Sequence, residues 1–426
     1  MKIKSISARE ILDSRGIPTL EALITLEDGT TAKGQVPSGA STGTTEVLEM
    51  RDRDKKRYFG KGTLKAVEKV NAVIAPSIIG KEFASQVEFD RHLIELDGTE
   101  LKEKLGGNSI LSASMAFCRA SAASMQKPLY EYFAEIYWGP GFDHSLLQLP
   151  QPMILIMEGG LHGNWATDFQ EYMVVPRKEK FPEFKEALRA GAEIFKATHD
   201  LLVERGYSGA VGFEGAFAPT TIKSNAEAFD LILEGITKAG YKPDDEIVLA
   251  IDIASSEFYN HKTGLYELKR EQKSLNREEW IDFQKEMYSQ YPIWSTEDPL
   301  DEEDWDGWAL FTQQFSQSHQ IVGDDLLTTN VKRIKKAIDD NAVNSVLIKL
   351  NQIGSVTETI NAIKLAVSAG YTAVISHRGG ETNDDMIADL VVGTAADQSK
   401  FGGPDRGERL AKYNRLTEIE EMISQK

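Results

Sequence analysis

Three carboxylates stand at the carboxyl ends of short apolar runs that have the composition of buried strands. The runs EIVLAID, PIWSTED and QIVGDD bring Asp252, Glu297 and Asp324 to these ends. Strand ends gather at one face of a closed (β/α) barrel, so we expect the three acids to point at one place. Carboxylates this close repel one another unless a cation lies between them. Hard oxygen ligands favour Mg²⁺, and the sequence therefore predicts a magnesium site here.

Cationic side chains follow at the ends of the later apolar runs. Lys349 ends SVLIK, His377 and Arg378 end TAVISHR, and Lys400 lies in DQSKFGGP. Lys349 is either a counter-ion to the acids or a base. Burial and a nearby cation would lower its pKa and supply the neutral amine that a base needs. His377, Arg378 and Lys400 together form a cationic surface opposite the acids. Such a surface suits a small acid that bears a carboxylate and a phosphate-like group.

One further carboxylate, Glu214, lies among small and apolar residues in the stretch AVGFEGAFAPTT. It is either a structural acid on a glycine-rich turn or a carboxyl that holds a proton to donate. Apolar surroundings, which include Phe213, raise the pKa of a carboxyl and favour its protonated form. Together the residues predict an elimination. Lys349 removes a proton next to a carboxylate, metal ions stabilise the enediolate, and Glu214 protonates a departing hydroxide.

The elements that would position these groups fall into two parts. The amino-terminal part alternates like strands and then becomes helical, with Asn108-Ser109 as a helix N-cap. The segment 138–152 is rich in proline and glycine and predicts a junction. After it, apolar strands alternate with amphipathic helices, which indicates a parallel sheet with helices outside. We expect domains at 1–138 and 139–426, the second of them a barrel.

Composition narrows the function classes. The chain has 426 residues, and 66 acidic against 48 basic side chains give a net charge of −18. This balance argues against nucleic acid or an anionic membrane as the main partner. The single cysteine, Cys118, cannot form an internal disulfide, and no apolar run has the length of a signal or a membrane span. We therefore expect a cytoplasmic protein.

Several longer motifs occur in a fixed order. They begin with LDSRG (12–16) and VPSGASTG (36–43), followed by Gly-Gly-x-His at 159–162 and QEYMVVP at 170–176. The later motifs are STEDPLDEEDWDGW, VGDDL, LIKLNQIGSVTET, AVISHRGGET and ERLAKYNRL. In these motifs and their order the chain resembles the enolase family over almost its whole length.

The resemblance implies an α/β protein with an N-terminal α+β capping domain and a C-terminal enolase-type (β/α)8 TIM barrel. It implies two Mg²⁺ ions, a small anionic substrate, and a homodimer or higher homo-oligomer. The catalytic residues that it implies are Lys349 as base, Glu214 as acid, Glu171 and His377. The implied metal ligands are Asp252, Glu297 and Asp324 for the first ion and Ser41 for the second. The implied substrate-binding residues are Gly39, Ala40, Ser41, His162, Gln170, Glu171, Ser376, His377, Arg378 and Lys400.

The chain departs from the family's motifs mainly around the substrate. The altered positions are Ile17, Glu158, Phe213, Ala216, Gly379, Phe401, Asp405 and Gly407. Gly379 stands where a serine of the family hydrogen-bonds the substrate phosphate, and such a charge-assisted bond is worth about 1.5–3 kcal/mol. Glu158 adds negative charge, while Phe213 and Phe401 add bulk. These changes predict a reshaped pocket.

Three functions stay open. The first is the reversible dehydration of 2-phospho-D-glycerate to phosphoenolpyruvate. The second is the same elimination on an analogue with an altered phosphoryl arm, as in the enolase-like carboxyphosphonoenolpyruvate synthases. The third is a non-catalytic binding protein, which is disfavoured because it would not need the base, the acid and the metal carboxylates together. A racemase with a Lys-x-Lys strand is also disfavoured, because Leu347 stands two residues before Lys349.

Overall fold

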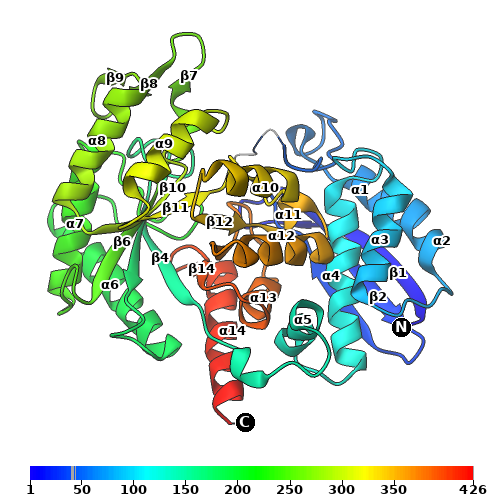
Figure 1. The fold of residues 1–426 in the computed structure, drawn as a ribbon. Helices are drawn as coiled ribbons and strands as arrows, with labels where there is room; N and C mark the ends of the chain where they lie inside the picture. Colours follow the sequence, from blue (N-terminus) through cyan, green and yellow to red (C-terminus); the bar gives the residue numbers. More distant parts are fainter. Residues whose placement is uncertain (40–42, 44, 426) are drawn as a thin grey trace.

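The computed structural model describes residues 1–39, 43 and 45–425 (Figure 1). The amino-terminal part is an antiparallel sheet in the order β1-β2-β3, packed against helices. The strands are β1 (Ile3–Leu12), β2 (Pro18–Leu26) and β3 (Thr31–Gln35). The helices are α1 (Leu64–Glu68), α2 (Ala75–Ile78), α3 (Gln86–Asp97), α4 (Gly107–Ser124) and α5 (Leu129–Trp138).

Helix α4 is buried along almost its whole length and packs on β2 and β3. Its small residues allow this close approach. Gly34 of β3 lies so near that a Cβ atom there would be 2.5 Å from the Ser112 carbonyl oxygen. The predicted N-cap is wrong, because the helix begins at Gly107. Asn108 lies inside the first turn, where its side-chain oxygen accepts a hydrogen bond from the Met50 backbone N–H at 3.0 Å.

The second part is a closed barrel in the order β10-β11-β12-β13-β14-β4-β5-β6 (Figure 1). Its strands are β4 (Gln151–Glu158), β5 (Glu171–Pro176), β6 (Ile247–Asp252), β10 (Ile293–Glu297), β11 (Gln320–Gly323), β12 (Ser345–Ile348), β13 (Thr372–Ser376) and β14 (Gln398–Lys400). The longer helices are α6 (Phe184–Glu204), α7 (Asn225–Lys238), α8 (Arg277–Gln290), α9 (Trp305–Phe315), α10 (Val331–Asp340), α12 (Val356–Ser368) and α14 (Gly407–Ser424). The shorter ones are α11 (Leu350–Ile353) and α13 (Met386–Gly393).

One strand of the barrel departs from the expected parallel sheet. Strand β5 pairs antiparallel with both β4 and β6, whereas the other neighbouring strands pair in parallel. The reason is the short connection 159–170, which has no helix to carry the chain back to the opposite end of the barrel. The reversal brings the first residue of β5 to the rim where the other strands end.

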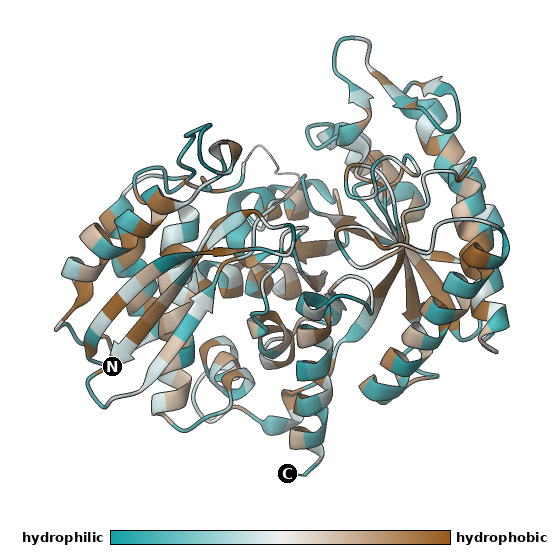
Figure 2. Cartoon of the chain, turned by 180° about the vertical axis from the view of Figure 1, so that it is seen from behind, coloured by the Kyte–Doolittle hydropathy of each residue, from teal (hydrophilic) through white to brown (hydrophobic). Residues whose placement is uncertain are grey.

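The barrel strands are largely hydrophobic (Figure 2), and the core lies both inside the barrel and between strands and helices. Ala216 belongs to the inner cluster, and Phe401 is fully buried with its ring 5.9 Å from that of Tyr413. The expectation that Phe401 reshapes the pocket is therefore wrong, because its ring fills the core.

A small sheet of β7 (Tyr259–Asn260), β8 (Leu265–Leu268) and β9 (Lys273–Leu275) projects from the barrel (Figure 1). Backbone hydrogen bonds join the two parts of the chain, among them Ser14 N–H to the Glu381 carbonyl and Ser38 N–H to the Gly380 carbonyl, each 2.7 Å. Among the described residues, no helix is both long and apolar enough to cross a bilayer.

The close packing of β3 on α4 gives a stability prediction. We expect Gly34→Ala to lower the free energy of unfolding by about 1–3 kcal/mol, because the added methyl group overpacks the core. The matched control is Gly407→Ala, an exposed position with no atom within 4 Å of the added Cβ. It should change stability by no more than about 0.5 kcal/mol. Denaturant unfolding of the three proteins measures this, and equal stabilities would contradict the packing described.

Candidate active site

Charged side chains gather at the rim where the barrel strands end. Glu158, Asp252 and Glu297 close β4, β6 and β10, and Lys400 closes β14. Glu171 opens the reversed strand β5 and lies opposite Asp252 on one side and Glu158 on the other in the strand register. All five are buried. Apolar runs that end in charged residues thus become strands that deliver charge to one buried place.

Lys400 lies against two of the three predicted metal carboxylates, Asp252 and Glu297, and against Glu171. Its ammonium is 2.6 Å from Glu297 Oε2, 3.1 Å from Asp252 Oδ2 and 3.2 Å from Glu171 Oε1. Burial lowers the pKa of Lys400, but the carboxylates outweigh burial and raise that pKa well above its usual value. Burial and then Asp252 raise the pKa of Glu297 well above its usual value. The group therefore holds more buried negative charge than one ammonium compensates.

The residues fit a divalent cation. Asp252 Oδ1 and Glu297 Oε1 are buried and have no hydrogen-bond partner among the described residues. The predicted set of Asp252, Glu297 and Asp324 does not form one close group among the described residues. Asp324 groups instead with Asp298 and Asp325, and the nearest carboxylate oxygens of these three all lie within 4.8 Å of one another. Asp298 orients the turn at 324–325, because its carboxylate accepts hydrogen bonds from the backbone N–H groups of Asp324 and Asp325 at 3.0 and 2.9 Å. Carboxylate oxygens with unused acceptor capacity are the donor set that Mg²⁺ prefers.

Lys349 pairs with Asp324, and their Nζ and Oδ2 atoms are 2.5 Å apart. Gln352 donates to the other oxygen of Asp324 at 2.9 Å and accepts from Thr329 at 2.6 Å. Burial lowers the pKa of Lys349, but Asp324 and after it Glu297 act in the opposite direction, and the pKa is raised overall. The predicted lowering is therefore wrong for the chain by itself, because the neighbouring carboxylate favours the ammonium form. Thr329 also positions Lys349 by accepting its backbone N–H at 3.0 Å.

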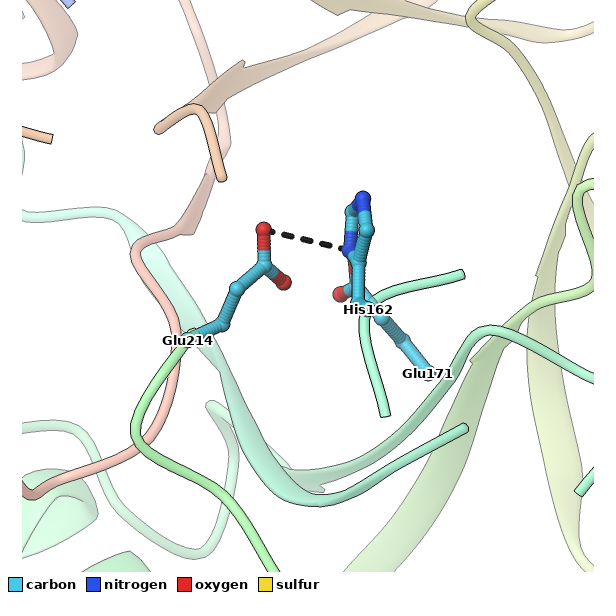
Figure 3. Close-up of side chains that lie close together, drawn as sticks. All are labelled: His162, Glu171 and Glu214. Carbon is cyan, nitrogen blue, oxygen red and sulfur yellow. Dashed lines mark ion pairs between the residues drawn. The ribbon is translucent and has the colours of Figure 1, made fainter. Parts of the chain in front are cut away.

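Glu214 and His162 face one another across the same pocket (Figure 3). Glu214 Oε1 is 3.3 Å from His162 Nδ1, and Glu214 Oε2 is 3.6 Å from His377 Nε2. Burial raises the pKa of Glu214, but the two imidazoles outweigh burial and hold the pKa well below its usual value. Burial lowers the pKa of His162, but Glu214 and after it Glu171 and Asp252 raise it, and the pKa is raised overall.

The prediction of apolar surroundings for Glu214 is therefore wrong. The side chain lies between two imidazoles supplied by distant parts of the chain, and the opposite pKa shifts of His162 and Glu214 favour the proton on His162. Phe213 does not cover the carboxyl, since it is 44% exposed to solvent.

Arg409 fixes the orientation of His377, and sequence reasoning assigned it no role. Its guanidinium lies 2.7 Å from His377 Nδ1 and donates to the carbonyl oxygens of Phe213 and Gly379 at 3.0 and 2.9 Å. Because Nδ1 accepts from Arg409, the ring proton of the neutral imidazole lies on Nε2, which faces Glu214. Burial lowers the pKa of His377 well below its usual value, consistent with this neutral form.

Arg378 is held by a residue that sequence reasoning also missed. Its guanidinium contacts Glu46 Oε2 and Oε1 at 3.0 and 3.2 Å and the Asn351 side-chain oxygen at 3.1 Å. Glu46 follows the 36–43 motif in the amino-terminal part, so the contact crosses to the barrel. No short-range pattern could reveal either Glu46 or Arg409, because each partner lies far away in the sequence.

The structure brings most of the predicted site residues to one pocket. It is lined by His162, Gln170, Glu171, Glu214, Lys349, Ser376, His377, Arg378, Gly379 and Lys400. Gln170 also reaches Asp252 Oδ2 at 3.0 Å. Gly39 lies beside Arg15, which donates to its carbonyl oxygen at 3.2 Å. Ala40 and Ser41, and with Ser41 the expected second magnesium site, lie outside the described residues.

The raised pKa of Glu171 predicts how stability depends on pH. Burial and neighbouring acids raise this pKa from 4.5 to about 8. Between these values the folded protein keeps a proton that the unfolded chain releases, so stability is lost as pH rises through this window. We expect the chelator-treated protein to unfold at lower denaturant concentration at pH 8 than at pH 5.

A matched pair of variants tests this assignment. Glu171→Gln should make the dependence of stability on pH between 5 and 8 less steep, by the contribution of one carboxyl. Glu21→Gln should leave it unchanged, because Arg9, Lys33 and Gln35 surround Glu21 and its pKa is lowered below this window. The same slope in the Glu171→Gln variant as in the parent would contradict the assignment.

Comparison with known families identifies both parts of the chain. Residues 3–133 match the family model of the enolase N-terminal domain. Residues 146–426 match the model of the enolase C-terminal TIM barrel domain. The two matches cover most of the chain and correspond to the amino-terminal sheet with its helices and to the barrel that carries the site. The chain therefore belongs to the enolase family.

Proposed function

We propose that the protein is a magnesium-dependent hydro-lyase that converts 2-phospho-D-glycerate to phosphoenolpyruvate and water. Membership of the enolase family supports a lyase. The observation that carries the specific proposal is the single pocket that holds Lys349 and the Glu214–His162 pair together with cationic groups for an anionic substrate. An elimination needs such a base and such an acid, both within reach of one small molecule.

The base side begins with Lys349. A divalent cation held by Asp252, Glu297 and Asp324 would compensate their charge and stabilise the enediolate that forms from the substrate carboxylate. With the charge of Asp324 compensated, less attraction holds the proton on Lys349, and its amine becomes available as a base. Lys349 then takes the proton from C2 of the substrate, and the electron pair of that bond passes into the carboxylate.

The acid side begins with the Glu214–His162 pair. The electron pair of the enediolate returns to form the double bond, the bond from C3 to oxygen breaks, and the departing hydroxide takes a proton from this pair. The proton favoured on His162, whose Nδ1 lies 3.3 Å from Glu214 Oε1, supplies it. The Nε2–H of His377, oriented by Arg409, supports the Glu214 carboxylate that is left. Water is the product at this side.

Arg378 is the proposed partner of the substrate phosphate. A guanidinium binds phosphate through two parallel hydrogen bonds, the same geometry in which Arg378 holds Glu46. The substrate phosphate and Glu46 therefore compete for one group, and binding is favoured when the phosphate carries the greater charge.

A second candidate function is the same elimination on an analogue of 2-phospho-D-glycerate. Gly379 favours it, because this residue lines the pocket beside Arg378 and offers no side-chain hydroxyl to a phosphate. A non-catalytic binding role has no comparable support, since it gives no reason to bury a lysine and an acid-imidazole pair in one pocket.

The direct test is the appearance of the enolpyruvate absorbance from 2-phospho-D-glycerate with Mg²⁺. We expect turnover by the parent protein, and Lys349→Ala should lower it by about 10²–10⁴-fold because the base is lost. The control is Lys335→Ala, which removes an exposed lysine that pairs with Asp339 on α10 and should leave turnover unchanged.

The outcomes separate the candidates. Turnover several orders of magnitude below that of the family, with folding and cation binding intact, would favour the analogue as substrate. Full activity of the Lys349→Ala variant would contradict the mechanism in either case.

A further inference from the structure

Glu158, which ends β4, lies directly beneath the loop that carries the proposed acid. It is 1% exposed, and its two carboxylate oxygens accept the backbone N–H of Glu214 at 3.1 and 3.3 Å. Gly212 packs against the same carboxyl, since a Cβ atom there would lie 2.1 Å from Glu158 Oε1. The backbone at 212–214 therefore packs against the buried carboxyl of Glu158. A residue with a side chain at position 212 would displace this carboxyl.

The charged groups around Glu158 come from three elements. Glu214 faces it from the loop, Arg409 from α14, and Glu171 is its partner in the register of β4 and β5. Burial and Glu214 raise the pKa of Glu158 to about 8, while the Glu214 backbone N–H and Arg409 act in the opposite direction. Glu158 and Glu214 are thus two neighbouring carboxyls that do not both ionise freely.

This arrangement bears on a difficulty at the acid. His162, His377 and Arg409 all favour the ionised form of Glu214, whereas an acid must hold a proton. A negative charge beside Glu214 acts the other way, because two adjacent carboxylates repel. Glu158 is buried next to Glu214 and hydrogen-bonds its backbone, so the charge that Glu158 acquires above about pH 8 acts on Glu214 through little solvent.

We propose that Glu158 is a positioning residue for proton donation, which fixes the backbone of Glu214 and, once ionised at basic pH, holds the transferable proton on the Glu214–His162 pair. The inference rests on the proposed elimination and deepens it. It gives a role to a carboxyl that the reaction itself does not use. It also accounts for Gly212, since only a residue without a side chain leaves room for the Glu158 carboxyl at this place.

The test is the pH profile of the Glu158→Gln variant with 2-phospho-D-glycerate and Mg²⁺. The amide oxygen of the glutamine still accepts a hydrogen bond from the Glu214 N–H, so the loop keeps its position while the negative charge of Glu158 is lost. We expect the high-pH fall of kcat to move to lower pH by about one unit, which is about a tenfold loss of kcat on the basic side. At lower pH kcat should change little, and KM should stay close to that of the parent.

Two further variants serve as a control and as a second test of the proposal. Glu21→Gln makes the same chemical change at a buried glutamate of β2 and should leave the profile in place. Gly212→Ala should move the profile in the same direction as Glu158→Gln, because the methyl group displaces the carboxyl. It serves as the test if Glu158→Gln fails to fold. A profile that superposes on the parent's in the folded variants would overturn the proposal.

A readout without substrate separates this inference from the proposed function. Infrared difference spectra of the parent against pH should show buried carboxyls that titrate near pH 8, and Glu158→Gln should lose one of them while that of Glu171 stays. If the parent does not convert 2-phospho-D-glycerate, the proposed function fails, yet the spectra still show whether Glu158 carries the titrating proton. Identical spectra for parent and variant would overturn the role of its charge.

Discussion

The ammonium of Lys400 lies among Glu171, Asp252 and Glu297, and the compensation of charge at this place is the constraint on which the rest of the site depends. Burying several carboxylates together is costly unless opposite charge and hydrogen bonds compensate them. One lysine does so only in part, which leaves Asp252 Oδ1 and Glu297 Oε1 without partners among the described residues. The excess of negative charge makes a divalent cation the natural complement of this site.

The same need for charge compensation applies on two sides of the pocket, which require opposite protonation states. In the proposed elimination Lys349 loses a proton on one side, and its neighbour Asp324 opposes this until the carboxylate is compensated. On the other side the Glu214–His162 pair must keep a proton, which the imidazoles and Arg409 draw away from the carboxyl. Buried Glu158 lies on this second side, and its ionisation above about pH 8 would favour retention of the proton by the Glu214–His162 pair. The protonation states of the base and the acid are thus set by neighbours rather than by burial alone.

Strand ends were readable from the sequence because an apolar run and the charged residue that closes it are adjacent. For this reason Asp252, Glu297 and Lys400 could be placed at one rim. Glu171 could not be placed this way, since it begins a reversed strand, and only the resemblance to the family pointed to it. The sheet was expected to be parallel because the pattern of the strands does not show the missing helix between β4 and β5.

Contacts between residues far apart in the sequence could not be predicted from the sequence. Glu46 reaches Arg378 and Arg409 reaches His377 across the fold, and no local pattern shows either pairing. The pKa of Glu214 was expected to be high because its neighbours in the sequence are apolar, whereas its neighbours in space are imidazoles. Phe401 was expected in the pocket for a similar reason, although its ring packs on Tyr413 in the core.

In the proposed mechanism the base Lys349 and the acid pair Glu214–His162 act from separate sides of the substrate. Removal of the C2 proton can therefore proceed without departure of the hydroxide. The most direct measurement is the exchange of the C2 proton of 2-phospho-D-glycerate for deuterium in D₂O with Mg²⁺, followed by NMR. The account predicts that Glu214→Gln exchanges this proton while forming little phosphoenolpyruvate, and that Lys349→Ala does neither. Exchange by the Lys349→Ala variant at the rate of the parent protein would contradict it.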